Sequence, residues 1–122
     1  MKEKEYSTYG KEIIVDMWGV NSKLLNDLDY ISNICIEAVK RAGATFVSIQ
    51  TKKFEPQGLT VLILLEESHL TYHSYPEKQF AAINCYTCGT NTKPDKAIDF
   101  IIEQLKPNPN RVYRQTIIRG VE

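Results

Sequence analysis

Residues 66–77, EESHLTYHSYPE, place hydroxyl, imidazole and carboxylate groups within one short segment. An imidazole titrates near neutral pH, so two histidines beside a serine suit acid–base chemistry. The apolar run at 61–65 comes directly before, and a strand formed there would hold the cluster rigidly. On an ordinary half-buried strand such residues are only polar surface, but their density here favours a functional site. The cluster consists of Glu66, Glu67, Ser68, His69, Thr71, His73 and Glu77.

Two cysteines downstream raise the alternative of a zinc site. Cys85 and Cys88 have the C-x2-C spacing, and His69 and His73 have the H-x3-H spacing, that zinc ligands use. If these segments are strands, the histidines share one face, whereas Cys85 and Cys88 point to opposite faces. A thioredoxin-like pair is disfavoured because no helix is predicted to begin at Cys85. We therefore expect no metal, and we interpret Cys85 as a small strand residue.

The elements that position these residues follow from the spacing of apolar side chains. Residues 11–18 predict a first strand, which turn-forming residues end at 19–22. Apolar residues then recur at alternating steps of four and three, which predicts one helix of about 20 residues ending at Gly43. Its inward stripe is Leu24, Leu28, Ile31, Cys35, Ala38 and Ala42.

The middle of the chain is rich in strand-forming residues. Four strands are predicted, at 45–54, 59–67, 69–75 and 80–88. A second helix is predicted from Pro94 to before Pro107, and residues 111–118 predict a strand that closes the sheet. This order fits an α+β fold, a two-layer α/β sandwich with an antiparallel-rich sheet and two helices on one face. We expect a single domain over residues 1–122.

Composition limits the partners. Fifteen Lys plus Arg balance fifteen Asp plus Glu, so no net field attracts nucleic acid or an anionic membrane. The longest apolar run is too short to span a bilayer, and the N-terminus does not resemble a signal peptide. Three cysteines without framework spacing suit a reducing compartment. We expect a cytoplasmic protein with a small-molecule partner, and self-association through sheet surface that two helices leave uncovered.

Several motifs together carry a resemblance to a known family. They are ESHLTYHSYPE at 67–77, YTCG at 86–89 and KFEPQG at 53–58. With GKEIIVDMWG at 10–19 and the helical segment at 26–44, the chain resembles bacterial S-adenosylmethionine decarboxylase proenzymes over nearly its whole length.

The resemblance implies that the chain cuts itself. Ser68 would attack the carbonyl of Glu67 and convert the amide to an ester, and β-elimination would then give fragments 1–67 and 68–122. The second fragment would begin with a pyruvoyl group derived from Ser68. His73 would be the acid/base in this processing, and the Thr60 hydroxyl would assist it where we expect a serine in the family.

The resemblance also implies roles in decarboxylation. The pyruvoyl group would form a Schiff base with the substrate amine and accept the electrons left when carbon dioxide departs. Cys88 would donate the proton to the resulting carbanion, since a thiol is mostly protonated at neutral pH. Phe54 and Tyr75 would lie against the adenine and the sulfonium, and Glu77 would accept both ribose hydroxyls. The product would serve polyamine (spermidine) synthesis, and the working unit would be a homodimer whose sites draw residues from both chains.

Some positions depart from the family pattern. Glu12 follows Gly10-Lys11 where many members read GRH, Lys52 replaces a histidine, and Thr60 lies in GLTV where members read GVSG. Because these changes surround the expected pocket, a pyruvoyl-dependent ornithine or arginine decarboxylase is a rival interpretation. Glu12 and Glu77 would then pair with the distal cation of the substrate, although Lys52 would repel it.

A third interpretation is a catalytically weak paralogue that binds and activates a true decarboxylase. Retention of Ser68, His73 and Cys88 argues against it, because a pure partner would not need them.

Overall fold

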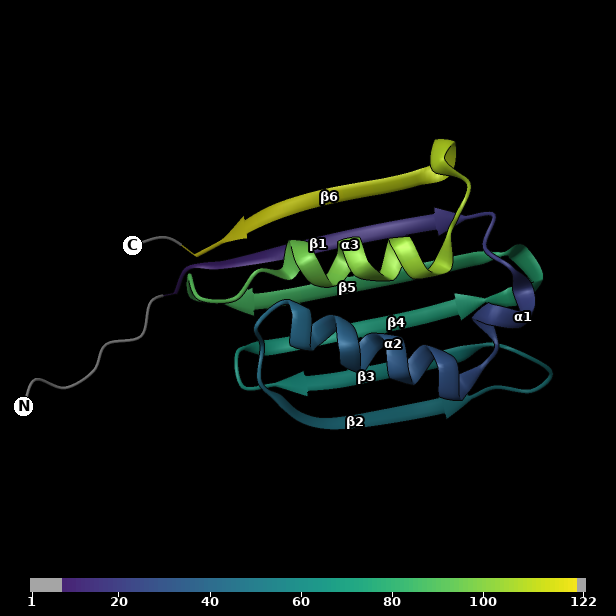
Figure 1. Cartoon of the computed structure of the whole chain (residues 1–122), viewed down its shortest axis with the longest axis horizontal. Helices are drawn as coiled ribbons and strands as arrows, with labels where there is room; N and C mark the ends of the chain where they lie inside the picture. The colour runs from purple at the N-terminus through teal and green to yellow at the C-terminus, as the bar shows by residue number, and fades with distance from the viewer. Residues whose placement is uncertain (1–7, 121–122) are drawn as a thin grey trace, which may run out of the picture.

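The computed structural model describes residues 8–120 and contains one six-stranded sheet with its helices on one side (Figure 1). All strand pairs are antiparallel, in the order β2-β3-β4-β5-β1-β6. This confirms the predicted α+β sandwich. The elements are β1 (Gly10–Trp18), α1 (Ser22–Leu25), α2 (Leu28–Arg41), β2 (Phe46–Lys53), β3 (Leu59–Leu65), β4 (Ser68–Tyr75), η1 (Pro76–Lys78), β5 (Phe80–Cys88), α3 (Pro94–Leu105), η2 (Pro109–Arg111) and β6 (Val112–Arg119).

Alternation along the central strands separates a core face from an open face. Helices α2 and α3 pack against each other and cover the core face, where apolar side chains of β1, β3, β4 and β5 are buried. In the described part of the chain, no helix or strand covers the opposite face. The open face of β4 carries His69, Thr71, His73 and Tyr75, and the core face carries Leu70, Tyr72 and Ser74.

The predicted helix of about 20 residues is wrong in its first third, because two helices replace it. The α1 helix ends at Leu25, and α2 begins at Leu28. Asp27 is the N-cap of α2, and its side chain accepts a hydrogen bond from the Tyr30 N–H at 3.0 Å. Such a cap satisfies a helix donor and favours a new start. Leu25, not the predicted Leu24, is fully buried. The break also lets the side chain of Asn26 accept from the Gly58 N–H at 2.9 Å.

The boundary of the third predicted strand also differs. Strand β3 ends at Leu65, so Glu66 and Glu67 form a two-residue turn and Ser68 begins β4. Leu64 pairs with His69 across this hairpin. The bond expected to be cut therefore lies where the turn meets β4.

Strand β5 places its two cysteines on opposite faces, as predicted. Cys85 is buried and Cys88 is exposed. Burial raises the pKa of both the Cys35 and the Cys85 thiols to about 12. Within residues 8–120, no helix is long and apolar enough to cross a membrane.

We expect one thiol to react in the native protein. Iodoacetamide at neutral pH should modify Cys88 rapidly, because alkylation needs an accessible thiolate, and should leave Cys35 and Cys85 unmodified. Intact-mass spectra should show a single adduct. The Cys88→Ser variant is the control and should show none, and rapid labelling of Cys85 would contradict the packing of β5.

Candidate active site

The turn between β3 and β4 is fixed by hydrogen bonds to the chain that enters β2. The Glu67 carboxylate accepts from both the N–H of Thr45 at 2.9 Å and its hydroxyl at 3.1 Å. The Glu66 N–H in turn donates to the Thr45 carbonyl at 2.9 Å. These contacts hold the 67–68 peptide in one orientation at the end of the sheet.

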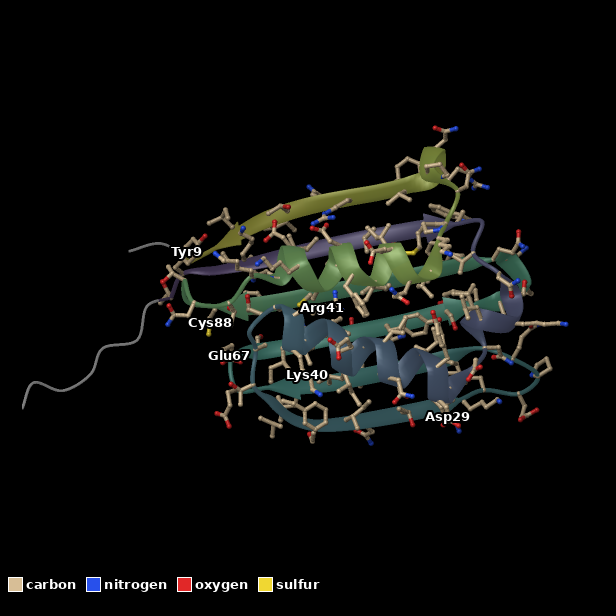
Figure 2. All side chains as sticks on the ribbon, in the orientation of Figure 1. Tyr9, Asp29, Lys40, Arg41, Glu67 and Cys88 are labelled. Carbon is tan, nitrogen blue, oxygen red and sulfur yellow. The ribbon has the colours of Figure 1, made fainter. Side chains whose placement is uncertain are left out.

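The end of β5 lies against the same turn. The Cys88 N–H donates to the Glu67 carbonyl oxygen at 3.0 Å, and Ser68 pairs with Thr87 in the β4–β5 ladder. Figure 2 shows Glu67 and Cys88 at the same end of the sheet. A donor aimed at a carbonyl oxygen stabilises negative charge that develops when the carbon is attacked. The structure thus brings together Glu67, Ser68 and Cys88.

A chain of polar contacts leads from Ser68 across the open face. The Ser68 hydroxyl lies 3.4 Å from His69 Nδ1, and His69 Nε2 lies 3.1 Å from Asn84 Oδ1. The Asn84 amide donates to Glu12 at 2.5 Å, and Arg119 donates to the other Glu12 oxygen at 2.7 Å. The hydrogen bond from Asn84, followed by the bond and charge of Arg119, lowers the pKa of Glu12 despite its partial burial.

Sequence reasoning did not identify Asn84 and Arg119 as part of this site. The missing signal is strand register: Glu12 pairs with Tyr86 on β5 and Ile117 on β6, so Asn84 and Arg119 flank it on the same face. Residue spacing alone does not give that register.

A pocket of about 520 Å³ lies at the opposite end of β4. In it, His73 Nδ1 lies 3.0 Å from the Thr60 hydroxyl. Five residues predicted from the sequence line this pocket: Phe54, Thr60, His73, Tyr75 and Glu77. The rest of the lining is Gln57, Gly58, Leu59 and Ser74. The predicted Glu12 is not part of it.

The predicted site residues therefore form two separate groups in one chain. Ser68 and His73 are five residues apart on one strand, a separation of about 16 Å, which is beyond the reach of their side chains. Glu12 lies with the Ser68 group, and Glu77, on η1, lies in the pocket. A single chain does not bring His73 to Ser68.

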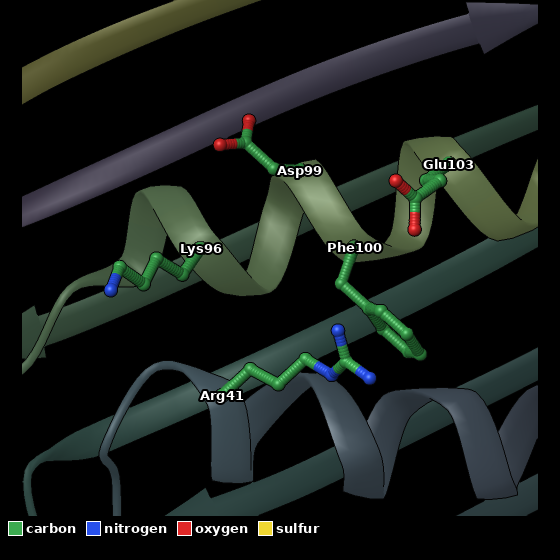
Figure 3. Close-up of a pocket in the computed structure, with 5 residues that line it drawn as sticks. All are labelled: Arg41, Lys96, Asp99, Phe100 and Glu103. Carbon is green, nitrogen blue, oxygen red and sulfur yellow. The ribbon is translucent and has the colours of Figure 1, made fainter.

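Another hollow, of about 370 Å³, lies between α2 and α3 on the helical side (Figure 3). The Arg41 guanidinium stacks over the Phe100 ring at 4.2 Å, and Asp99 on the same helix pairs with Arg114. Arg41 and Asp99 are thus engaged with neighbouring side chains, and the sheet separates this hollow from the open-face histidines.

A family model and curated relatives match nearly the whole chain. Residues 11–120 match the family model described as S-adenosylmethionine decarboxylase. The chain is 52% identical over 117 residues to S-adenosylmethionine decarboxylase proenzyme 2 of Bacillus anthracis, covering 96% of this chain and 94% of that one. It is 41% identical to the S-adenosylmethionine decarboxylase proenzyme of Methanococcus maripaludis, with 92% and 90% covered.

A solved structure gives the same result. The crystal structure of the adenosylmethionine decarboxylase from Aquifex aeolicus superposes with a TM-score of 0.87 at 35% identity, covering 95% of this chain and 94% of that one. The fold and the hairpin define a decarboxylase-type α+β sandwich. The chain belongs to the S-adenosylmethionine decarboxylase family.

The two carboxylates singled out by the sequence should differ in their effect on stability. Glu12→Ala should lower the free energy of unfolding by about 1–3 kcal/mol, because it leaves Asn84 and Arg119 without their acceptor. Glu77→Ala should change it by less than about 0.5 kcal/mol, since Glu77 is exposed. Urea unfolding in a Ser68→Ala background, which keeps the chain uncut, measures both.

The Glu12 contribution has a defined pH dependence. Because the folded pKa of Glu12 lies below its ordinary value of 4.5, the contribution is full above that value and is lost as the pH falls through the lowered pKa. The difference between Glu12→Ala and its parent should shrink accordingly. Equal losses for Glu12→Ala and Glu77→Ala at neutral pH would contradict the described pairing.

Proposed function

We propose that this chain is a self-processing, pyruvoyl-dependent decarboxylase of S-adenosylmethionine that serves polyamine synthesis. Membership of the family supports the reaction. The single observation that carries the proposal for this chain is the contact at the turn, where Ser68 follows a Glu67 carbonyl that accepts a hydrogen bond from the Cys88 N–H.

Processing begins at that carbonyl. The Ser68 hydroxyl oxygen bonds to the Glu67 carbonyl carbon, the 67–68 C–N bond breaks, and the chain is then joined by an ester. Loss of the Ser68 α-proton expels the Glu67 carboxylate, and hydrolysis of the resulting enamine releases ammonia and leaves a pyruvoyl group. The Cys88 N–H would bind the negative charge on the Glu67 oxygen during the first step.

The residues present fit a pyruvoyl group at position 68. Thr87, which pairs with Ser68, has a buried hydroxyl without a hydrogen-bond partner among residues 8–120, so it is available to donate to an acceptor. When formed, the group would supply a carbonyl that accepts the electrons left by carbon dioxide. The exposed Cys88 thiol, at the end of the neighbouring strand, would hold the proton for the substrate carbon.

The pocket at the other end of β4 supports binding of a positively charged nucleoside. The exposed rings of Phe54 and Tyr75 offer faces for the adenine and the sulfonium. The Glu77 carboxylate offers two acceptor oxygens for the ribose hydroxyls. Nothing in this scheme needs a metal.

We further propose a homodimer in which one copy's pocket completes the other's cleavage site. The separation of about 16 Å along β4 prevents His73 from acting on Ser68 of its own chain. The open face offers exposed Leu62, Leu64 and Tyr113 as apolar contact surface. Partners other than the small-molecule substrate and this second copy are not required. A cytoplasmic location suits three unpaired cysteines.

The alternative substrates gain no support from the structure. Glu12, expected to bind the distal cation of ornithine or arginine, already pairs with Arg119 and Asn84. The interpretation as an activator without chemistry gains none either, since the groups at Glu67, Ser68 and Cys88 are in contact or adjacent.

Intact-mass analysis and carbon dioxide release together test this function. The parent should split at 67/68 with a pyruvoyl-blocked second fragment and should turn over S-adenosylmethionine. Ser68→Ala should stay one inactive chain, and Cys88→Ala should still be cut but turn over at least 100-fold more slowly, as expected for loss of a general acid. Cleavage of Ser68→Ala would exclude the assigned nucleophile, and turnover of only ornithine or arginine would exclude the assigned substrate.

Coexpression of two variants tests the shared site. Ser68→Ala keeps His73, and His73→Ala keeps Ser68, so neither should be cut alone. With different tags and in one cell, mixed dimers should cut the His73→Ala chain, since the partner supplies the imidazole. Efficient cleavage of His73→Ala alone, or none in isolated mixed dimers, would contradict the proposal.

A further inference from the structure

Which group donates and which accepts in the polar contacts across the open face is determined by the carboxylate of Glu12. Glu12 receives Arg119 on one carboxylate oxygen, and an ionised carboxylate can only accept hydrogen bonds. Asn84 must therefore turn its amide nitrogen toward Glu12, in agreement with the 2.5 Å contact between Asn84 Nδ2 and Glu12 Oε2. The same carboxylate is kept ionised by the groups that lower its pKa.

The orientation of the Asn84 amide determines the tautomer of the His69 imidazole. With its nitrogen toward Glu12, Asn84 presents its carbonyl oxygen to His69 Nε2 at 3.1 Å. Nε2 must then carry the proton, which leaves the lone pair of a neutral ring on Nδ1. Nδ1 is the nitrogen that lies 3.4 Å from the Ser68 hydroxyl.

The ring is also held in place by the sheet. His69 pairs with Tyr86 across the β4–β5 ladder, and the two rings lie 5.8 Å apart. The Arg119 guanidinium lies over Tyr86 from β6, with its carbon 5.6 Å from the ring centre. Together with Glu12 on β1, residues of four strands (β1, β4, β5 and β6) thus surround the His69 imidazole.

We propose that His69 is the base that takes the Ser68 hydroxyl proton in the first step of self-cleavage, and that Arg119, Glu12 and Asn84 position it in the required tautomer. The inference rests on the proposed function. The serine proton moves to Nδ1 as Oγ bonds to the Glu67 carbonyl carbon. When the 67–68 C–N bond breaks, the imidazolium returns that proton to the new amine, so the step consumes nothing.

The division of labour between the two histidines follows from their positions. His69 contacts Ser68 in its own chain, whereas His73 lies about 16 Å away along β4. His69 then serves formation of the ester, and His73 of a second copy serves its elimination. The 3.4 Å contact is long for a hydrogen bond, and catalytic contacts commonly tighten as the reaction proceeds.

Hydroxylamine distinguishes the two steps, because it splits an ester and leaves an amide intact. We expect His69→Gln to slow cleavage at least 100-fold, as loss of a general base does, and to remain one chain after hydroxylamine treatment. His73→Ala is the matched control and should also persist uncut, but hydroxylamine should split it at 67/68. The intact mass of each variant, measured before and after treatment, shows whether its chain has been split.

The outcomes separate this inference from the proposed function. An uncut parent would overturn the proposed function. A parent that is cut, together with His69→Gln that is cut at a similar rate, would overturn only the role of His69. Splitting of His69→Gln by hydroxylamine would do the same, because the ester would have formed without the imidazole. Circular dichroism and thermal unfolding against Ser68→Ala establish that the variant is folded.

An exchange of donor and acceptor tests the positioning residues. Glu12→Gln should slow cleavage, since an amide can turn Asn84 around and present a donor to His69. Adding Asn84→Asp restores an acceptor-only group beside His69 Nε2. The amide introduced at position 12 can then donate to this carboxylate and keep its oxygen for Arg119. The double variant should therefore be cut faster than Glu12→Gln. A double variant slower than Glu12→Gln would overturn the role of this chain in setting the tautomer.

Discussion

The hydrogen bond from the Cys88 N–H to the Glu67 carbonyl joins the end of β5 to the β3–β4 turn. The 3.0 Å contact depends on the β4–β5 register, in which Ser68 lies opposite Thr87. A shift by one residue would move every side chain of β5 to the other face and remove the Cys88 thiol from the turn. The burial of apolar side chains beneath α2 and α3 favours that register, because a slip by one residue would expose them.

The two faces of the sheet carry different tasks. The core face buries apolar residues of four strands beneath the helices, and the open face carries histidines, Asn84 and Glu12 at fixed spacing. Rigid strands separated by about 4.8 Å hold polar groups more accurately than loops do. The pocket at the far end of β4 is different, since it combines strand residues with Gly58 and the Glu77 turn.

The sequence predicted the parts that depend on local pattern. Alternation placed Cys85 and Cys88 on opposite faces, and the prolines at 94 and 107 gave the bounds of α3. Local pattern failed at Asn26 and Asp27, where Asn26 ends one helix and the Asp27 side chain caps the next within a continuous apolar stripe. It also could not show that Glu12 is paired with Arg119, because that contact joins residues 107 positions apart through a strand register.

The strand order has a consequence for the molecule after a cut at 67/68. Strand β1 would belong to the first fragment, yet it lies between β5 and β6 of the second, and β3 pairs with β4 along a further ladder. The fragments would be interlocked through three ladders, so they would part only by unfolding. Unfolding would then separate four fragments instead of the two chains of an uncut dimer, so the melting temperature of the mature protein would depend more steeply on its concentration.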